Sequence, residues 1–131
     1  MMNSIKNEID YKKITRLKQQ FDIFEKKRIQ ENIAWSFIYE CQEIWDLFNC
    51  IEQDGWAVSK FDAQDSQIIY RTFHDIENMK NANFDELCKF LTYCVVGEKY
   101  CEGHFACCVK IGAVKSIIDR IVIISGYNGT D

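Results

Sequence analysis

The sequence contains no proline and only six glycines. Because these two residue types most often interrupt helices and form tight turns, their scarcity predicts long helices joined by short turns and argues against a fold rich in β-hairpins. No window reaches the roughly 18 consecutive apolar residues that a membrane-spanning helix needs. The first residues also lack the apolar run of a secretory signal. We therefore expect a cytoplasmic protein that does not associate with membranes.

The seven cysteines are odd in number, and several of them recur at helical spacing. In a chain without a secretion signal, this pattern is typical of free thiols in a reducing compartment, where cysteine packs as a small hydrophobic residue. With 47% hydrophobic and 14% aromatic residues, the 131-residue chain can bury a substantial core. Its length is that of one domain, so we predict a single domain over residues 1–131.

The net charge of −4 is unevenly distributed. Residues 1–30 contain eight Lys or Arg and four Asp or Glu, a net +4, whereas residues 31–131 contain eight and sixteen, a net −8. An acidic body repels phosphate backbones, so direct nucleic-acid binding is not expected. The same charge either attracts a partner with a basic surface or only keeps a solvated face in water.

Apolar residues recur at three- and four-residue steps along most of the chain, which is typical of amphipathic helices. The first predicted helix covers about residues 10–31, and its face opposite the apolar one is basic. That apolar face consists of Ile14, Leu17, Phe21 and Phe24. Further helices are predicted over residues 36–53, 63–79, 83–96, 104–111 and 114–124, with a short extended connector at 56–62. The expected fold class is all-α, an irregular or orthogonal bundle of five to six helices.

Several predicted helix ends carry recognisable signals. Ser36 and Asp62 are candidate N-caps of the second and third helices, because their side-chain oxygens can accept a backbone N–H. Asn83 and Glu86 have the spacing of a capping box at the start of the fourth helix. Gly97 is expected to end that helix, since glycine is the usual residue just beyond a helix C-terminus.

The densest group of chemically reactive side chains follows the fourth helix, between Gly97 and Phe105. Cys101 is placed near the N-terminus of the next helix, where the helix dipole favours a thiolate. His104 lies one turn away as a general base, with Glu102 as the group that orients it. Cys101, Glu102 and His104 are therefore the catalytic candidates if the protein is an enzyme.

Two other interpretations of this corner remain open. Zinc accepts thiolate and imidazole ligands, and four such residues fall within eight positions: Cys101, His104, Cys107 and Cys108. A structural zinc site usually takes its ligands from two separated pairs, so we expect neither a metal nor a cofactor here. In a purely structural corner, Gly103 permits a tight turn and Cys101 fills the core. Glu102 then caps the next helix, and His104 bonds a backbone carbonyl.

Binding residues are expected in the connector and at the corner. The candidates for lining a small-molecule or peptide pocket are the aromatic residues Trp35, Trp45, Trp56 and Phe61. Trp56 is the strongest of them, because it lies in the connector close to Phe61 and Asp62, and these three are the binding residues expected there. Packing in the core is nevertheless the more usual role of such aromatic residues. Tyr100, with the three catalytic candidates beside it, completes the predicted binding surface.

Five short motifs occur in order along the second half of the chain: Asp54-Gly55-Trp56, Phe61-Asp62, Leu91-Thr92, Glu98 to His104, and Gly112 before an aliphatic helix. This pattern resembles a small bacterial and phage family of unknown function, and its Cys-Glu-Gly-His core is the most specific part. Ala63 stands where the family often has tryptophan, and Lys99-Tyr100 replaces its Arg-Phe. The resemblance covers about residues 37–123, which is nearly all of the core that we predict over residues 36–124. It implies a small helical domain of bacterial, phage or mobile-element origin without an established reaction.

Charge and family class together lead to a first hypothesis, a non-enzymatic accessory or interaction protein of a phage or mobile element. Its acidic surface would bind a basic protein partner, for example as an inhibitor that occupies the nucleic-acid groove of a host defence protein. The alternative is a small cysteine- or zinc-dependent hydrolase or transferase that uses Cys101, Glu102 and His104. A homodimer is expected if the apolar face of the first helix is left exposed.

Overall fold

The computed structural model describes residues 2–57, 60 and 62–126, with side chains from residue 11 onward. This part of the chain forms α-helices and two short 3-10 helices and contains no β-strand, which confirms the predicted all-α class. In chain order the elements are α1 (Met2–Gln30), η1 (Trp35–Glu40), α2 (Gln42–Gln53), α3 (Ala63–His74), η2 (Ile76–Asn81), α4 (Phe84–Tyr100), α5 (His104–Lys110) and α6 (Ala113–Ser125).

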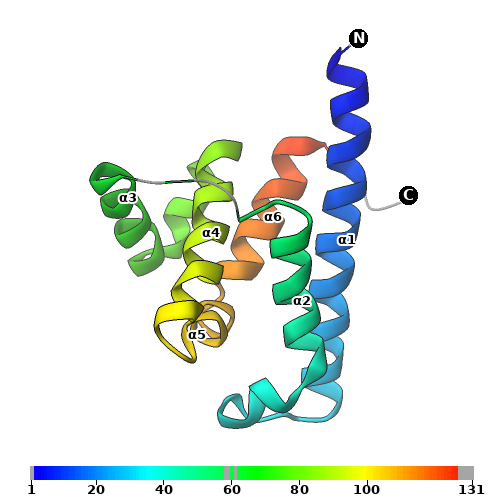
Figure 1. The fold of residues 1–131 in the computed structure, drawn as a ribbon, viewed down its shortest axis with the longest axis vertical. Coiled ribbons are helices and arrows are strands. Elements are labelled where there is room, and N and C mark those ends of the chain that lie inside the picture. The colour runs from blue at the N-terminus through cyan, green and yellow to red at the C-terminus, as the bar shows by residue number, and fades with distance from the viewer. Residues whose placement is uncertain (1, 58–59, 61, 127–131) are drawn as a thin grey trace.

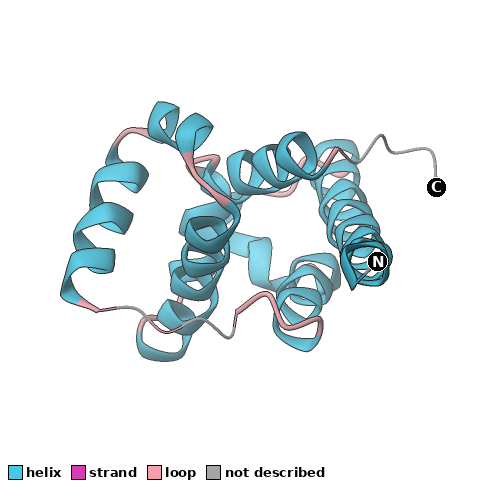
Figure 2. Cartoon of the chain, turned by 90° about the horizontal axis from the view of Figure 1, so that it is seen from above, coloured by secondary structure: helices cyan, strands magenta, loops and turns pink. Residues whose placement is uncertain are grey.

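Helix α4 occupies the centre of the bundle. It packs against α2, α3, α5 and α6, and Figure 1 shows it between α3 at one edge and α1 at the other. Helix α2 runs back along α1, so these two form an antiparallel pair. Seen from above, α1 is viewed nearly end-on at the edge of the molecule (Figure 2). Leu87 and Leu91 of α4 are completely buried, so the core lies along this helix.

The apolar face of α1 is covered by the same chain. Ile14, Leu17 and Phe24 are at most 1% exposed, because α1 packs on α2 and α6. The Tyr11 hydroxyl also donates a hydrogen bond to the Ser125 carbonyl oxygen at 2.9 Å, which joins α1 to the end of α6. The exposed apolar face on which the expectation of a homodimer depended is therefore not present.

The second predicted helix is divided at Cys41. Residues 35–40 form η1, Cys41 is extended with φ −88° and ψ 115°, and α2 begins only at Gln42. Ser36 therefore lies inside η1 and is not an N-cap, contrary to the prediction. The indole N–H of Trp45 donates to the Tyr39 carbonyl oxygen at 2.9 Å, a carbonyl that a continuous helix would use for its own ladder.

The third predicted helix is divided in the same way, at Asp75. Its backbone there is extended, and its side chain accepts a hydrogen bond from the Glu77 N–H at the start of η2. The capping predictions for the neighbouring helices are confirmed. Asp62 forms a capping box with Asp65 at the start of α3, and α4 begins with a capping box between its N-cap and Glu86.

Helix α4 continues through Gly97 and ends at Tyr100, so the prediction that Gly97 terminates it is wrong. A glycine costs a helix about 1 kcal/mol relative to alanine, so its place inside α4 needs a reason. A Cβ atom added at Gly97 would overlap the imidazole of His104. The missing side chain therefore lets α5 lie directly against the backbone of α4.

Candidate functional site

The corner between α4 and α5 is a tight reversal of three residues. Cys101 is extended with φ −144°, and Gly103 has the left-handed φ of +94° that glycine adopts without strain. The expected role of Gly103 in the turn is therefore confirmed. Gly103 is also the N-cap of α5, and a glycine there has no side-chain oxygen to accept the first helical N–H groups.

Glu98 supplies that missing acceptor from the last turn of α4. Its Oε1 accepts a hydrogen bond from the Phe105 N–H at 2.9 Å, and its Oε2 accepts one from the Gly103 N–H at 3.3 Å. A carboxylate at a helix N-terminus satisfies unpaired donors and interacts favourably with the helix dipole. Glu102, which the sequence suggested as the cap, is exposed and has no such bond.

Tyr39 of η1 completes the cap. Its hydroxyl donates to Glu98 Oε1 at 2.6 Å and accepts from the Ala106 N–H at 2.9 Å. Burial, together with the adjacent carboxylate, raises the pKa of Tyr39 well above its usual value of 10. The phenol therefore stays protonated and remains a donor to Glu98 throughout the neutral range.

His104 is held on the surface of α4. Its Nε2 lies 3.1 Å from the Tyr93 carbonyl oxygen, and because a carbonyl oxygen only accepts, this nitrogen carries the proton. The ring also meets Tyr93 edge-to-face at 4.7 Å, and its Nε2 is 3.6 Å from the Cys108 sulfur. The prediction that His104 bonds a backbone carbonyl is confirmed, and Nε2 is not available as a general base.

The other candidate residues of the corner point outward. Tyr100 is 87% exposed, and Cys101 and Glu102 are also exposed. The Cys101 sulfur approaches the carbonyl oxygen of Glu102 at 4.0 Å, and no described side chain is placed as a base beside it. Cys101 does not fill the core, in contrast to the structural interpretation of the sequence. The three catalytic candidates are adjacent in sequence, but their functional groups do not converge.

The four residues with zinc-ligand chemistry are separated by burial. Cys101 and Cys107 are exposed, whereas Cys108 is buried. Within the described residues, no three His, Cys, Asp or Glu side chains gather as metal ligands do. Burial raises the pKa of Cys94 well above its usual value, and Cys94 also shares a hydrogen bond with Cys108. The Cys94 thiol therefore stays protonated, and both buried sulfur atoms pack between α4 and α5.

The connector residues have different positions. Trp56 is completely buried, with its ring 5.9 Å from that of Phe84 and the Lys13 ammonium 4.4 Å from its centroid. It therefore fills the core and offers no surface to a ligand. Asp62 is exposed as the N-cap of α3. Phe61, the third residue of this predicted site, lies outside the described residues.

Beside the corner, a groove of about 630 Å³ separates η1 from α5. Trp35 and Ile38 of η1 form one side, and Ala106 and Lys110 of α5 form the other. Glu102 lies at its edge. The sequence named Trp35 as a candidate for lining a pocket, but not the groove itself, because the groove depends on η1 being a separate element that packs on α5.

Most carboxylates of the acidic middle of the chain have local partners. Lys89 pairs with Asp65 at 3.1 Å and with Asp85 at 3.2 Å, and Lys80 pairs with Glu77 at 2.8 Å. The hydrogen bond from the Asp62 backbone N–H, and after it the contact with Lys89, lowers the pKa of Asp65. The acidic surface therefore also stabilises helix ends and joins α3 to α4.

No helix within the described residues is long and apolar enough to cross a membrane. The fold and the corner define an all-α domain whose α4–α5 joint is capped by a carboxylate from the preceding helix. The chain belongs to a family of unknown function, DUF6508, whose model matches residues 11–125. This confirms the resemblance seen in the sequence. No curated protein and no solved structure matches the chain.

Proposed function

We propose that this protein is a non-enzymatic interaction protein that binds a partner with a basic surface. The observation that carries the proposal is the structural use of the corner. Glu98 caps α5 through two backbone N–H groups, and the Nε2 of His104 is bonded to a backbone carbonyl. The groups nearest to a catalytic arrangement thus hold two helices together.

The distribution of charge along the chain supports a partner with a basic surface. From residue 62 to residue 89 the chain has six Asp or Glu and three Lys or Arg, a net −3. This acidic segment covers α3, η2 and the start of α4. Glu77 and Asp85 in it are about three-quarters exposed. Exposed ion pairs contribute little energy, so these carboxylates can exchange their own lysines for those of a partner. Complementary charge chiefly increases association rate and specificity.

The proposal also includes a biological role for this interaction. A phage or mobile-element protein of this charge would act by occupying the basic nucleic-acid groove of a host protein, such as a defence protein. Support for this comes from the net charge and from the small helical domain. The alternative, a hydrolase or transferase at Cys101, Glu102 and His104, has no base beside the Cys101 thiol among the side chains that the structure describes.

The test removes charge from the acidic segment and keeps its caps. Asn accepts the same backbone hydrogen bonds as Asp at an N-cap, so Asp62→Asn and Asp75→Asn preserve α3 and η2. Glu77→Gln and Asp85→Asn complete the neutralised variant. The control neutralises four carboxylates elsewhere: Asp22, Glu40, Asp46 and Asp119.

The three proteins are used as bait in a bacterial lysate, bound proteins are identified by mass spectrometry, and duplex DNA is added as competitor. We expect the wild type and the control to capture a nucleic-acid-binding protein that DNA displaces, and the neutralised variant to lose it. Equal capture by the neutralised variant, or capture that DNA does not displace, contradicts the proposal.

A further inference from the structure

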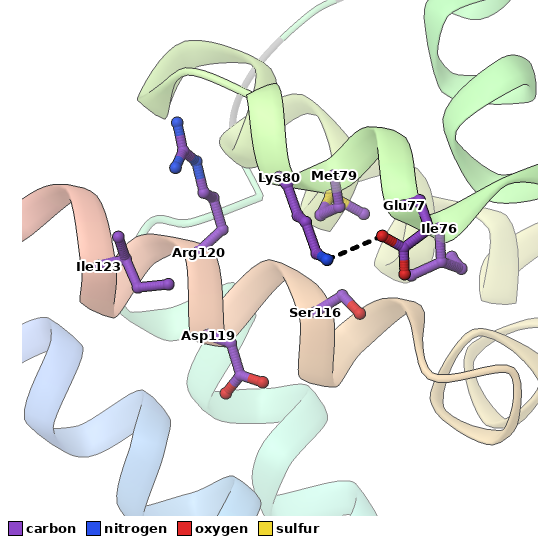
Figure 3. A pocket seen from close by; sticks show the side chains of 8 residues that line it. All are labelled: Ile76, Glu77, Met79, Lys80, Ser116, Asp119, Arg120 and Ile123. Atoms are coloured by element: carbon purple, nitrogen blue, oxygen red, sulfur yellow. Dashed lines mark ion pairs between the residues drawn. The ribbon is translucent and has the colours of Figure 1, made fainter.

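A second cavity, of about 440 Å³, lies between η2 and α6, away from the corner. Figure 3 shows its walls, with Ile76 and Met79 on η2 facing Ser116 and Ile123 on α6. Met79 is 2% exposed and forms the apolar floor, whereas Ile123 is 69% exposed at the rim. A volume of a few hundred cubic ångströms with an apolar floor is typical of small-molecule sites.

The polar groups of this cavity are mainly donors. Arg120 donates from Nε to the Ala82 carbonyl oxygen at 2.9 Å, and none of the described carboxylates lies within ion-pair distance of its guanidinium. Its remaining N–H groups are therefore open to an acceptor. Asp119 points away from η2 in Figure 3 and pairs with Lys115 at 2.8 Å. The Ser116 hydroxyl adds a further donor within the cavity.

The second cation of the cavity, Lys80, already forms an ion pair, but that pair is weak. Its ammonium pairs with Glu77 at 2.8 Å, but both side chains are about three-quarters exposed. An exposed pair of this kind is worth little, so an incoming anion can replace Glu77. Lys80 extends from η2 toward α6 over Ser116, which places its charge at the mouth of the cavity (Figure 3). The lining thus combines two cations with two carboxylates and has no net charge, in a chain whose net charge is −4.

We propose that this cavity binds a small monocarboxylate with an apolar tail. The tail would pack on Met79, Ile76 and Ile123, and the carboxylate would pair with Lys80. The Arg120 guanidinium lies apart from the Lys80 ammonium, toward Ala82, and adds a second positive charge to the same cavity (Figure 3). A singly charged group suits the site because Glu77 and Asp119 lie close by and would repel a dianion such as phosphate. This proposal does not rest on the protein partner described above, although the cavity shares Glu77 and Lys80 with the acidic segment.

The test uses octanoate as the probe and methyl NMR of isoleucine and methionine as the readout. We expect saturable shifts of the Met79, Ile76 and Ile123 methyl signals, with a dissociation constant on the order of 1 mM. Octanol and octylamine, which have the same tail without the carboxylate, serve as ligand controls and should not saturate. The absence of saturable shifts, or equal shifts with all three compounds, overturns the proposal.

Substitutions of charged residues test which cation of the cavity binds the carboxylate of octanoate. Lys80→Met should weaken octanoate binding by about threefold to fivefold, whereas Glu77→Gln should tighten it by about twofold because Lys80 loses its competitor. Lys99→Met, on α4 and paired with Glu52 outside the cavity, is the matched control and should leave binding unchanged. If Lys99→Met weakens binding as much as Lys80→Met, or Glu77→Gln weakens it, the site is wrong.

Discussion

At the scale of single residues, the corner depends on a carboxylate that is not among the catalytic candidates. Glu98 accepts hydrogen bonds from two backbone N–H groups of the α5 N-terminus and from the Tyr39 hydroxyl. Glu102, four residues later, is exposed and accepts none of these bonds. The two glutamates therefore form a natural pair for comparison.

Glu98→Ala is expected to lower the free energy of unfolding by about 2 kcal/mol, because it leaves partly buried donors unsatisfied. Glu98→Gln should cost less, since an amide oxygen still accepts one bond. Glu102→Ala is the control and should stay within about 0.5 kcal/mol of the wild type. Urea denaturation followed by circular dichroism measures all three. Equal effects of Glu98→Ala and Glu102→Ala would contradict this assignment of the cap.

Gly97 and His104 are expected to be energetically coupled. Gly97→Ala places a methyl group into the imidazole and should destabilise the fold by about 1–3 kcal/mol. In the double variant with His104→Ala the clash is absent, so its cost should fall below the sum of the two single costs by about 1–3 kcal/mol. A double-mutant cycle in urea measures this coupling. Additive costs would show that the ring does not occupy the space above Gly97.

At the scale of the elements, the helix ends with local signals are the predictable ones. Asp62 and its partner Asp65 lie three residues apart, so the capping box can be recognised from spacing alone. The break at Cys41 cannot, because Tyr39 is held by Trp45 and by Glu98, which is 59 residues away. For the same reason the sequence located the corner but assigned its cap to the wrong glutamate.

The sequence nevertheless contains one signal for the cap of α5. A helix that begins after glycine has no side-chain acceptor of its own at the N-cap, so a carboxylate from another position is needed. The carboxylates nearest in sequence were Glu98 and Glu102. Choosing between them required knowing that α4 continues past Gly97, which brings Glu98 into its last turn facing α5.

The N-cap of α3 is expected to stabilise this whole helix. Asp62→Ala should destabilise the protein by about 1 kcal/mol, because the Asp65 N–H loses its acceptor. Asp62→Asn should be close to wild type, since the amide oxygen replaces the carboxylate oxygen. Thermal unfolding measures both variants. If Asp62→Asn is as unstable as Asp62→Ala, the contribution is one of charge and not of the hydrogen bond.

At the scale of the whole molecule, buried thiol and phenol groups make the free energy of unfolding depend on pH in the alkaline range. Burial raises the pKa of Cys50 to about 11 and also raises the pKa values of Tyr39 and Cys94. Below pH 9, the ordinary pKa of a thiol, these groups are protonated in both the folded and the unfolded chain. Above it, the unfolded thiols release protons first, so unfolding becomes more favourable.

We therefore expect the free energy of unfolding to be nearly constant from neutral pH to pH 9 and to fall as the pH rises toward 11. Cys50→Ala should make this fall shallower, whereas Cys101→Ser, at an exposed position, should not change its slope. Urea denaturation between neutral and alkaline pH in the presence of a reductant measures the dependence. A free energy of unfolding that does not change across this window would contradict the assigned burial.

The measurement that tests the account most directly is the rate at which each thiol of the native protein reacts with a small alkylating reagent at neutral pH, read residue by residue by mass spectrometry. If the corner is a joint, Cys101, which has no described side chain placed beside it as a base, should react within about threefold of Cys107, the other exposed thiol. Cys94 and Cys108 should stay protected. A Cys101 that reacts more than about tenfold faster than Cys107 would show an activated thiol and contradict the non-enzymatic account.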